Sequence, residues 1–485
     1  MTANNQSTNP TSEKLGPVER LLRIFTEVRA GEATTVLLLT LDVFLLLTAY
    51  YLLKTVREPL ILTVEGGAEV KSYASAGQAV LLVGVVHVYA WLAKRYGRLL
   101  LLTITSLFFA SNLVLFFFLG RMGVPLGVPF YLWVGCFSLT VIAQFWSFAN
   151  DVYTPEQGKR LFAIVGVGSS IGAIFGAKIA GVLFVPLGPY TMMLAAGGVI
   201  LLSVGLIRIV DARESARVTS EAKGTEAKET EAKAPEAKAP EAPVGGTGGF
   251  TLILRDRYLL MIALLSLILN WVNSTGEYVL DRTLIEGAAR KVAEGTAGGL
   301  DVKQFIGVFK ADFFLWVNVI GAALQLFFVS RIIKFLGLRV ALMVMPVIAL
   351  GGYMTMAFFP LLYLVKAAKI AENSVDYSIQ NTSRQMLFLP LSREAKYNAK
   401  AAIDTVFVRG GDVMSAVVVA VGSQLAFGTK HFAMVNMVLI VAWIALVWVI
   451  GRTFKERTSD AETAEKDASV KAGAAKPVAD EATSA

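Results

Sequence analysis

Long apolar stretches separated by short polar segments run along most of the chain. A helix of about 20 apolar residues is long enough to cross the ~30 Å hydrocarbon core of a bilayer. Six such windows occur in the first half, at residues 34–53, 74–93, 99–120, 128–149, 161–185 and 190–210. Six more occur in the second half, at residues 258–280, 312–333, 340–358, 361–389, 401–427 and 432–450. The pattern predicts an all-α polytopic membrane protein with twelve transmembrane helices.

Basic residues follow alternate windows and predict the topology. The loops after the second, fourth, eighth and tenth windows carry Lys94, Arg95 and Arg98; Lys159 and Arg160; Arg331, Lys334 and Arg339; and Arg393, Lys396 and Lys400. Basic loops tend to stay in the cytoplasm, so both termini are expected there, in a multi-pass protein of the inner (plasma) membrane. The longer segment 282–310 is expected outside.

The polar segments divide the chain into five parts. We expect a cytoplasmic N-terminal segment with an amphipathic helix (1–33), a six-helix half (34–210), a linker (211–250), a second six-helix half (251–451) and a cytoplasmic tail (452–485). The linker is rich in Glu, Ala and Lys and contains several prolines, a composition that predicts disorder. The tail is also expected to be disordered.

The two halves resemble each other, because a basic loop runs into a glycine-rich helix in both. TPEQGKRLFAIVGVGSSIGA in the first half corresponds to LSREAKYNAKAAIDTVFVRGG in the second. Two six-helix repeats predict a major facilitator-like architecture, in which substrate binds near the bilayer midplane between the halves. Within the first segment, Gly166, Gly168, Gly172 and Gly176 are interpreted as helix-packing positions, because small residues four apart let helices approach closely.

Composition narrows the possible functions. Only 17% of residues are charged, yet the formal net charge is +8, which suits binding of an anionic substrate. One cysteine and two histidines are too few for a zinc cluster or a histidine relay. No phosphate-binding loop for ATP hydrolysis is found. These observations favour a secondary transporter with no metal, cofactor or catalytic site, and disfavour an enzyme or receptor.

Several charged residues fall inside or at the ends of the apolar windows, where they are costly and therefore functional candidates. The basic ones are Lys54, Arg57, Lys366, Lys369 and Lys400. Together they would form a positive cavity for phosphate groups, which lysine and arginine bind through charge-assisted hydrogen bonds. Residues with a gating or coupling role are expected to include Asp42, Asp281, Glu372, Asp376, Asp404 and Arg409. Glu277 is assigned to the substrate site and to gating.

Two other interpretations remain open for these charges. They could pair among themselves, Lys369 with Glu372 or Asp376, Lys400 with Asp404, and Arg409 with Asp412. Alternatively, intramembrane carboxylates such as Asp42, Glu277 and Asp376 could carry protons. The second interpretation predicts a proton-coupled major facilitator transporter of another phosphorylated or anionic metabolite.

Three segments resemble the ATP/ADP translocase family of plastids and intracellular bacteria. They are AYYLLKTVREPLILT, FWSFANDVYTPEQGKRLFAIVGVGSSIG and PLSREAKYNAKAAIDTVFVRGGD. The resemblance implies a nucleotide carrier of twelve helices that exchanges ATP for ADP. It also implies that Arg57, Lys54, Glu277 and Lys400 are important for transport. Three departures are the lack of an acidic residue near the start of the fourth window, in FYLWVGCFSL, then Asp281, where family members tend to be basic, and the long linker.

The expected partners follow from this function. They are a nucleotide or another phosphorylated small molecule and the lipid bilayer; no nucleic acid is expected, and the protein is expected to be a monomer. Transport would proceed by alternating access through the basic central cavity.

Overall fold

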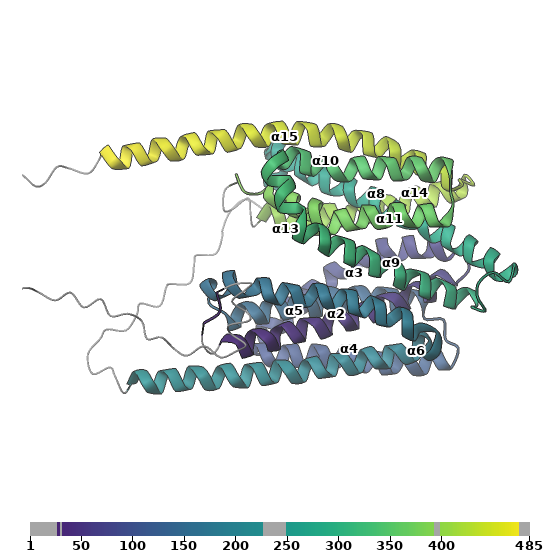
Figure 1. The fold of residues 1–485 in the computed structure, drawn as a ribbon, viewed down its shortest axis with the longest axis horizontal. Coiled ribbons are helices and arrows are strands. Elements are labelled where there is room, and N and C mark those ends of the chain that lie inside the picture. The colour runs from purple at the N-terminus through teal and green to yellow at the C-terminus, as the bar shows by residue number, and fades with distance from the viewer. Residues whose placement is uncertain (1–26, 30–31, 227–248, 392–397, 475–485) are drawn as a thin grey trace, which may run out of the picture. The chain divides into compact units, whose positions relative to one another are not determined.

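The computed structural model describes residues 27–29, 32–226, 249–391 and 398–474, and these residues form helices without any strand (Figure 1). Among them, ten helices are long and apolar enough to cross a membrane. The all-α polytopic fold class is therefore confirmed, and the count of twelve spans stays a prediction.

The first half contains five long helices. They are α2 (Glu32–Leu62), α3 (Gly67–Arg95), α4 (Arg98–Arg121), α5 (Gly127–Val152) and α6 (Pro155–Glu226). The helix α6 contains both the fifth and the sixth predicted window. Its backbone leaves the helical region at Gly188, where φ is +70°, a value that glycine adopts without strain. The break lies between the two windows, so the boundary predicted between them agrees with the structure.

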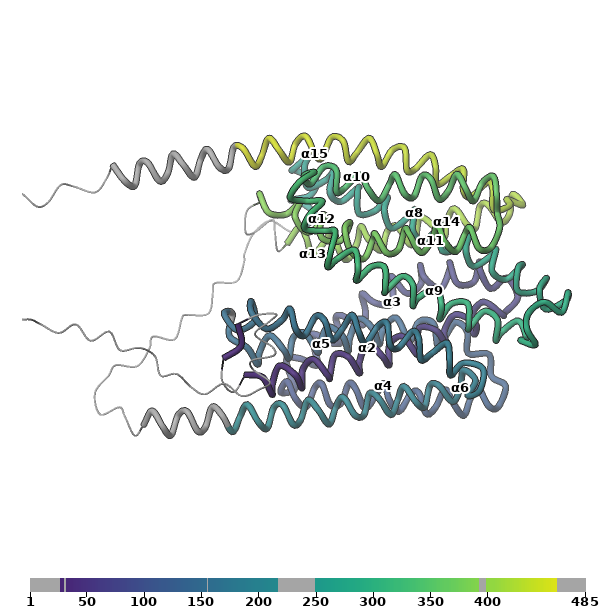
Figure 2. Tube along the Cα trace, in the orientation of Figure 1, coloured from purple at the N-terminus to yellow at the C-terminus, as the bar shows by residue number. Residues whose placement is uncertain are grey.

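The second half is more interrupted. Its elements are α7 (Gly249–Arg255), α8 (Arg257–Ala293), α9 (Val302–Phe327), α10 (Val329–Phe358), α11 (Leu362–Val375), the π-helical turn η1 (Asp376–Gln380), α12 (Asn381–Met386), α13 (Lys400–Ala402), the π-helical turn η3 (Ile403–Phe407), α14 (Val408–Gln424) and α15 (Thr429–Ala474). Figure 2 traces the path through α11, α12 and α13. The tenth and eleventh predicted windows thus each contain a π-helical turn.

Several expected boundaries differ from the structure. The segment 282–310 is mostly helical, because α8 continues to Ala293 and a capping box of Asp301 and Gln304 starts α9 at Val302. The helix α6 continues to Glu226 and α15 to Ala474, into the segments expected as disordered linker and tail. Their Ala, Glu and Lys residues are strong helix formers, which explains both extensions. Most of the N-terminal segment 1–33, in which an amphipathic helix is expected, lies outside the described residues.

Two compact units are formed. Unit 1 comprises residues 1–60, 82–236 and 307–315, and unit 2 comprises residues 61–81, 237–306 and 316–485. Each unit therefore contains part of a helix from the other half of the sequence. The first turns of α3 belong to unit 2, and a middle segment of α9 belongs to unit 1.

Glycines allow close helix packing in both units. In unit 1, a methyl group on Gly172 would collide with the main-chain oxygen of Phe44 in α2, and Gly168 and Gly176 face α2 in the same way. Gly166 faces open space. The packing role predicted for this glycine series thus holds for three of its four members. In unit 2, Gly411 of α14 packs against α8 in a comparable arrangement.

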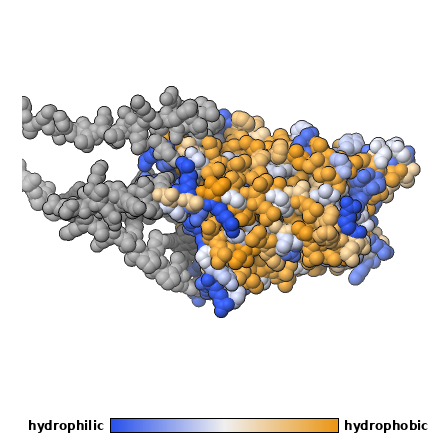
Figure 3. Space-filling view, turned by 90° about the horizontal axis from the view of Figure 1, so that it is seen from below, coloured by the Kyte–Doolittle hydropathy of each residue, from blue (hydrophilic) through white to orange (hydrophobic). Residues whose placement is uncertain are grey.

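The surface agrees with a membrane location. On the face shown in Figure 3, hydrophobic side chains gather over the middle of the helices, and hydrophilic side chains lie toward the helix ends. Large apolar side chains such as Val80, Phe335 and Val438 are more than 70% exposed. Such exposure is unfavourable in water and favourable in lipid.

Candidate functional site

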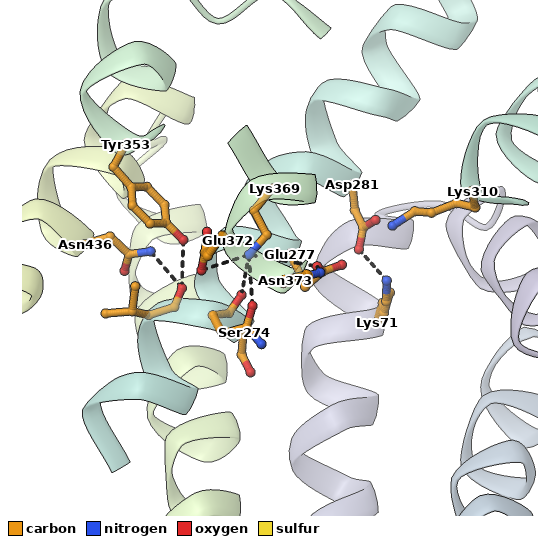
Figure 4. Close-up of polar contacts among 12 residues, drawn as sticks. Lys71, Ser274, Glu277, Asp281, Lys310, Tyr353, Lys369, Glu372, Asn373 and Asn436 are labelled. Carbon is orange, nitrogen blue, oxygen red and sulfur yellow. Dashed lines mark hydrogen bonds and ion pairs between the residues drawn. The ribbon is translucent and has the colours of Figure 1, made fainter. Parts of the chain in front are cut away.

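A wholly buried lysine lies at the centre of the polar cluster in unit 2. Lys369 of α11 donates a 2.9 Å hydrogen bond from Nζ to Oδ1 of Asn273, and its Nζ lies 3.1 Å from Oε1 of Glu372. Glu372 follows three residues later on the same helix, so the pair is set by helical spacing. Figure 4 shows the contact between Lys369 and Glu372. The predicted pairing of Lys369 with Glu372 is confirmed.

Glu277 of α8 forms the more exposed edge of this cluster. Its Oε1 accepts a 2.9 Å hydrogen bond from Nδ2 of Asn373 and lies 3.9 Å from Nζ of Lys369 (Figure 4). The side chain of Glu277 is 25% exposed, whereas that of Lys369 is not exposed at all. Lys369 is thus inaccessible to solvent, whereas its partner Glu277 is partly exposed.

Gly276 makes room for the cluster. A methyl group at this position would lie 2.9 Å from Nζ of Lys369 and would overlap the hydroxyl of Tyr353. That hydroxyl donates a 2.9 Å hydrogen bond to the main-chain oxygen of Val272, which also accepts one from the amide of Asn436 (Figure 4). The backbone of α8 is thus held from two sides at the turn that carries Glu277.

A second group in unit 2 ties the start of α3 to α8. Nζ of Lys71 lies 2.6 Å from Oδ2 of Asp281, whose side chain is 1% exposed (Figure 4). One turn earlier on α8, the hydroxyl of Tyr278 donates a 2.7 Å hydrogen bond to Oε1 of Glu69. Asp281, expected in a gating role, is therefore an ion-pair partner of a lysine from the first half of the sequence.

A third group is centred on Asp412 of α14. Its carboxylate accepts hydrogen bonds from the hydroxyl of Ser274 at 2.6 Å and from the amide of Asn270 at 2.9 Å. Arg409 lies one turn away on α14, with Nη1 3.4 Å from Oδ2 of Asp412. The predicted pairing of Arg409 with Asp412 is confirmed.

Unit 1 contains a basic cluster at the end of α2. Nη2 of Arg57 lies 2.9 Å from Oε1 of Glu58, and Nζ of Lys310 in α9 lies 3.4 Å from Oε2 of the same carboxylate. The guanidinium of Arg57 also stacks over Tyr131, 4.4 Å from the ring centre. Nζ of Lys54 lies 4.3 Å from the ring centre of Phe314. Cation–π contacts of this kind stabilise a positive charge without neutralising it.

The remaining candidate residues lie elsewhere in the two units. Asp42 is wholly buried in unit 1. In unit 2, Lys366 and Asp376 are half-buried on α11 and η1. Asp404 pairs with Arg384 of α12, with 3.7 Å between Oδ1 and Nη2, and not with Lys400 as one interpretation expected. Nζ of Lys400 lies 5.7 Å from the centre of the Phe388 ring.

Four buried charged residues in the described part of the chain were not predicted from the sequence, namely Glu32, Glu58, Lys71 and Lys310. Lys310 was missed because the eighth window was started at residue 312, which left Lys310 in a loop. Lys71 was missed because the second window was started at residue 74. Glu58 follows Arg57 directly, and an acid next to a candidate cation at a helix end was the signal that could have identified it.

Comparisons with known proteins agree with one another. The model of the TLC ATP/ADP transporter family matches residues 11–120, 130–373 and 363–454. ADP,ATP carrier protein 2 of Chlamydia pneumoniae is 24% identical over 93% of this chain and 94% of its own length. ADP,ATP carrier protein 3 of Rickettsia conorii is 23% identical over 67% of this chain and 69% of its own.

Solved structures resemble the fold. The nucleoside transporter NupG has a TM-score of 0.60 and 12% identity, covering 87% of this chain and 99% of its own. A bacterial homolog of the human lysosomal transporter Spinster has a TM-score of 0.56 and 13% identity, covering 89% and 99%. These likenesses confirm the major facilitator-like architecture.

Proposed function

Because the chain belongs to the TLC ATP/ADP transporter family, we propose that it exchanges ATP for ADP across the inner (plasma) membrane by alternating access. The observation that carries this proposal is the presence of buried cations in membrane-spanning helices of a chain from this family. Arg57 has a side chain only 13% exposed and Lys310 is wholly buried, and both lie on helices that are long and apolar enough to cross a membrane. Cations in such places are energetically costly, so their presence indicates a role in binding or transport.

The basic side chains are given different roles. Arg57 and Lys54 bind substrate phosphates through charge-assisted hydrogen bonds, and the aromatic rings of Tyr131 and Phe314 stabilise their positive charges. Lys366 and Lys400 of unit 2 are the further phosphate ligands. Lys369 holds Glu277 and Glu372 in place, and Glu277 contacts the substrate or gates its access. Asp281, Asp376, Asp404 and Arg409 take part in gating.

We also propose the membrane topology and the oligomeric state of the protein. Both termini lie in the cytoplasm, as the basic loops predict. The protein acts as a monomer in the bilayer, and it translocates nucleotide without chemically converting it. Its polar cluster residues thus have binding and gating roles only.

Uptake of labelled ATP into proteoliposomes tests the exchange. Vesicles containing the purified protein are loaded with ADP or left empty, and uptake is followed with and without a pH gradient. We expect uptake that depends on internal ADP and is insensitive to the gradient. Equal failure of uptake in all vesicles would contradict nucleotide transport.

A second candidate function is proton-coupled transport of another phosphorylated anion. Asp42 favours it, because a wholly buried carboxylate in a spanning helix suits proton binding. This alternative predicts uptake into empty vesicles that is driven by a pH gradient and abolished by a protonophore. An Asp42→Asn variant would lose the gradient dependence, whereas under the exchange mechanism it would transport like the unaltered protein.

A further inference from the structure

Two buried ion pairs join the halves of the sequence in a reciprocal way. In unit 2, Lys71 from the second helix of the first half pairs with Asp281 from the first helix of the second half, at 2.6 Å (Figure 4). In unit 1, Lys310 from the second long helix of the second half pairs with Glu58 from the first helix of the first half, at 3.4 Å. Each half thus contributes one lysine and one carboxylate.

The pairs lie on the helix segments that the halves exchange. Lys71 is in the part of α3 that belongs to unit 2, and Lys310 is in the part of α9 that belongs to unit 1. Further contacts accompany each pair. Tyr278 donates a hydrogen bond to Glu69 beside Lys71, and Lys54 stacks over Phe314 beside Lys310. Reciprocal placement on the exchanged segments points to a joint role in the conformational change.

We propose that Glu58 and Asp281 are internal substitutes for substrate phosphate on Lys310 and Lys71, and that they lock the empty protein until an anionic substrate takes over the lysines. This inference rests on the proposed function and extends it, because it adds Lys310 and Lys71 to the phosphate ligands. It also gives a physical origin for the coupling of transport to a counter-substrate.

Burial of the two ion pairs makes them hard to separate in the empty protein. The side chains of Lys310, Glu58 and Asp281 are at most 1% exposed, and that of Lys71 is 10% exposed. Breaking a buried ion pair leaves an uncompensated charge, which is strongly unfavourable. Another anion that reaches the lysines offsets this cost and favours separation of the pairs. A nucleotide phosphate supplies that anion, and lysine binds its oxygens through charge-assisted hydrogen bonds.

Arg57 strengthens the case for phosphate over a simpler anion. It contacts the same carboxylate as Lys310, with 2.9 Å between Nη2 and Oε1 of Glu58. One carboxylate thus lies between two cations, the arrangement that a multiply charged phosphate group satisfies better than a carboxylate does. The displaced Glu58 must then find water or another donor, which requires the surrounding helices to rearrange.

The test measures how strongly uptake depends on internal ADP. For the unaltered protein, Glu58→Gln and Asp281→Asn, we measure the ratio of ATP uptake into ADP-loaded vesicles to that into empty vesicles. Each substitution is expected to reduce this ratio by about tenfold, which corresponds to ~1.4 kcal/mol of lost coupling. Glu32→Gln is the matched control, because Glu32 is a buried acid paired with Arg160 at 3.0 Å, and both belong to the first half. Its ratio should not change.

Two further measurements separate the inference from the proposed function and from misfolding. The double variant Glu58→Gln/Lys310→Met removes both charges of this pair together, so Lys310 is not left as a buried cation without its carboxylate, and it should also lose the dependence on ADP. Thermal stabilisation by tripolyphosphate, measured in detergent, should be greater for Glu58→Gln than for the unaltered protein or Glu32→Gln. Equal stabilisation of all three would overturn the inference even if nucleotide exchange is observed. A protein that is stabilised as expected but does not exchange nucleotides would contradict only the proposed function.

Discussion

Unit 1 and unit 2 compensate their central cations in different ways. In unit 2, Lys369 is wholly buried between a carboxylate at 3.1 Å, a second at 3.9 Å and the amide of Asn273. In unit 1, Arg57 retains 13% exposure and combines one carboxylate with the face of Tyr131. We expect Lys369 to hold its cluster together and Arg57 to bind the ligand. The comparison shows that two basic residues of one membrane protein can be compensated by different surroundings.

The largest expected effect is on stability, at Lys369. Lys369→Met leaves Glu372 buried without its cation, so the free energy of unfolding should fall by about 3–5 kcal/mol. The midpoint of unfolding in detergent measures this loss. The double variant Lys369→Met/Glu372→Gln should recover much of it, because neither charge remains. If the single variant kept full stability, Lys369 would not stabilise unit 2, and the contrast drawn between Lys369 and Arg57 would be wrong.

The next largest effect is on transport, at Arg57. Arg57→Ala should reduce ADP-dependent ATP uptake by about 100-fold, because a charge-assisted contact to phosphate contributes up to ~3 kcal/mol. Its unfolding midpoint should change little, since Lys310 remains beside Glu58. Arg57→Lys keeps the charge but loses the planar guanidinium group. Its uptake should lie between that of Arg57→Ala and that of the unaltered protein. Lys400→Ala is expected to resemble Arg57→Ala, and normal uptake by both alanine variants would exclude this site.

A smaller effect is expected where charge is not involved. Gly172→Ala forces the main chain of α2 away from α6, which should cost about 1–3 kcal/mol of stability, as overpacking does. Gly166→Ala is the control on the same helix, because its position faces open space. The difference between their unfolding midpoints isolates the helix contact. Equal midpoints would show that α2 and α6 can separate without loss.

The smallest effect is expected at an exposed ion pair. Arg452 and Glu456 lie one turn apart on α15, with 3.2 Å between Nε and Oε1 and with side chains at least 60% exposed. Solvent screens such a pair, so Arg452→Ala should change stability by less than about 0.5 kcal/mol. The same unfolding measurement tests it. A large change would mean that burial does not explain why the ion pairs of this protein differ in strength.

Local features of the structure could be predicted from the sequence, and distant ones could not. Apolar length located the spans, and helical spacing identified Lys369–Glu372 and Arg409–Asp412, because residues three apart lie on one helix face. Lys71 and Asp281 are 210 residues apart, and no local pattern relates them. Lys310 was missed because the eighth window was started at residue 312. The windows thus captured buried charges that lie well inside an apolar stretch, such as Asp42 and Lys369, and missed those just beyond its ends.

The two π-helical turns have a consequence for how relatives of this protein are aligned. A π-helical turn contains one residue more than the α-helical turn it replaces, so it rotates every later side chain by about 100° relative to a regular helix. Beyond η1 and η3, an ungapped helical-wheel comparison of the tenth and eleventh predicted windows would assign residues to the wrong face. A relative without either turn would need a one-residue gap there.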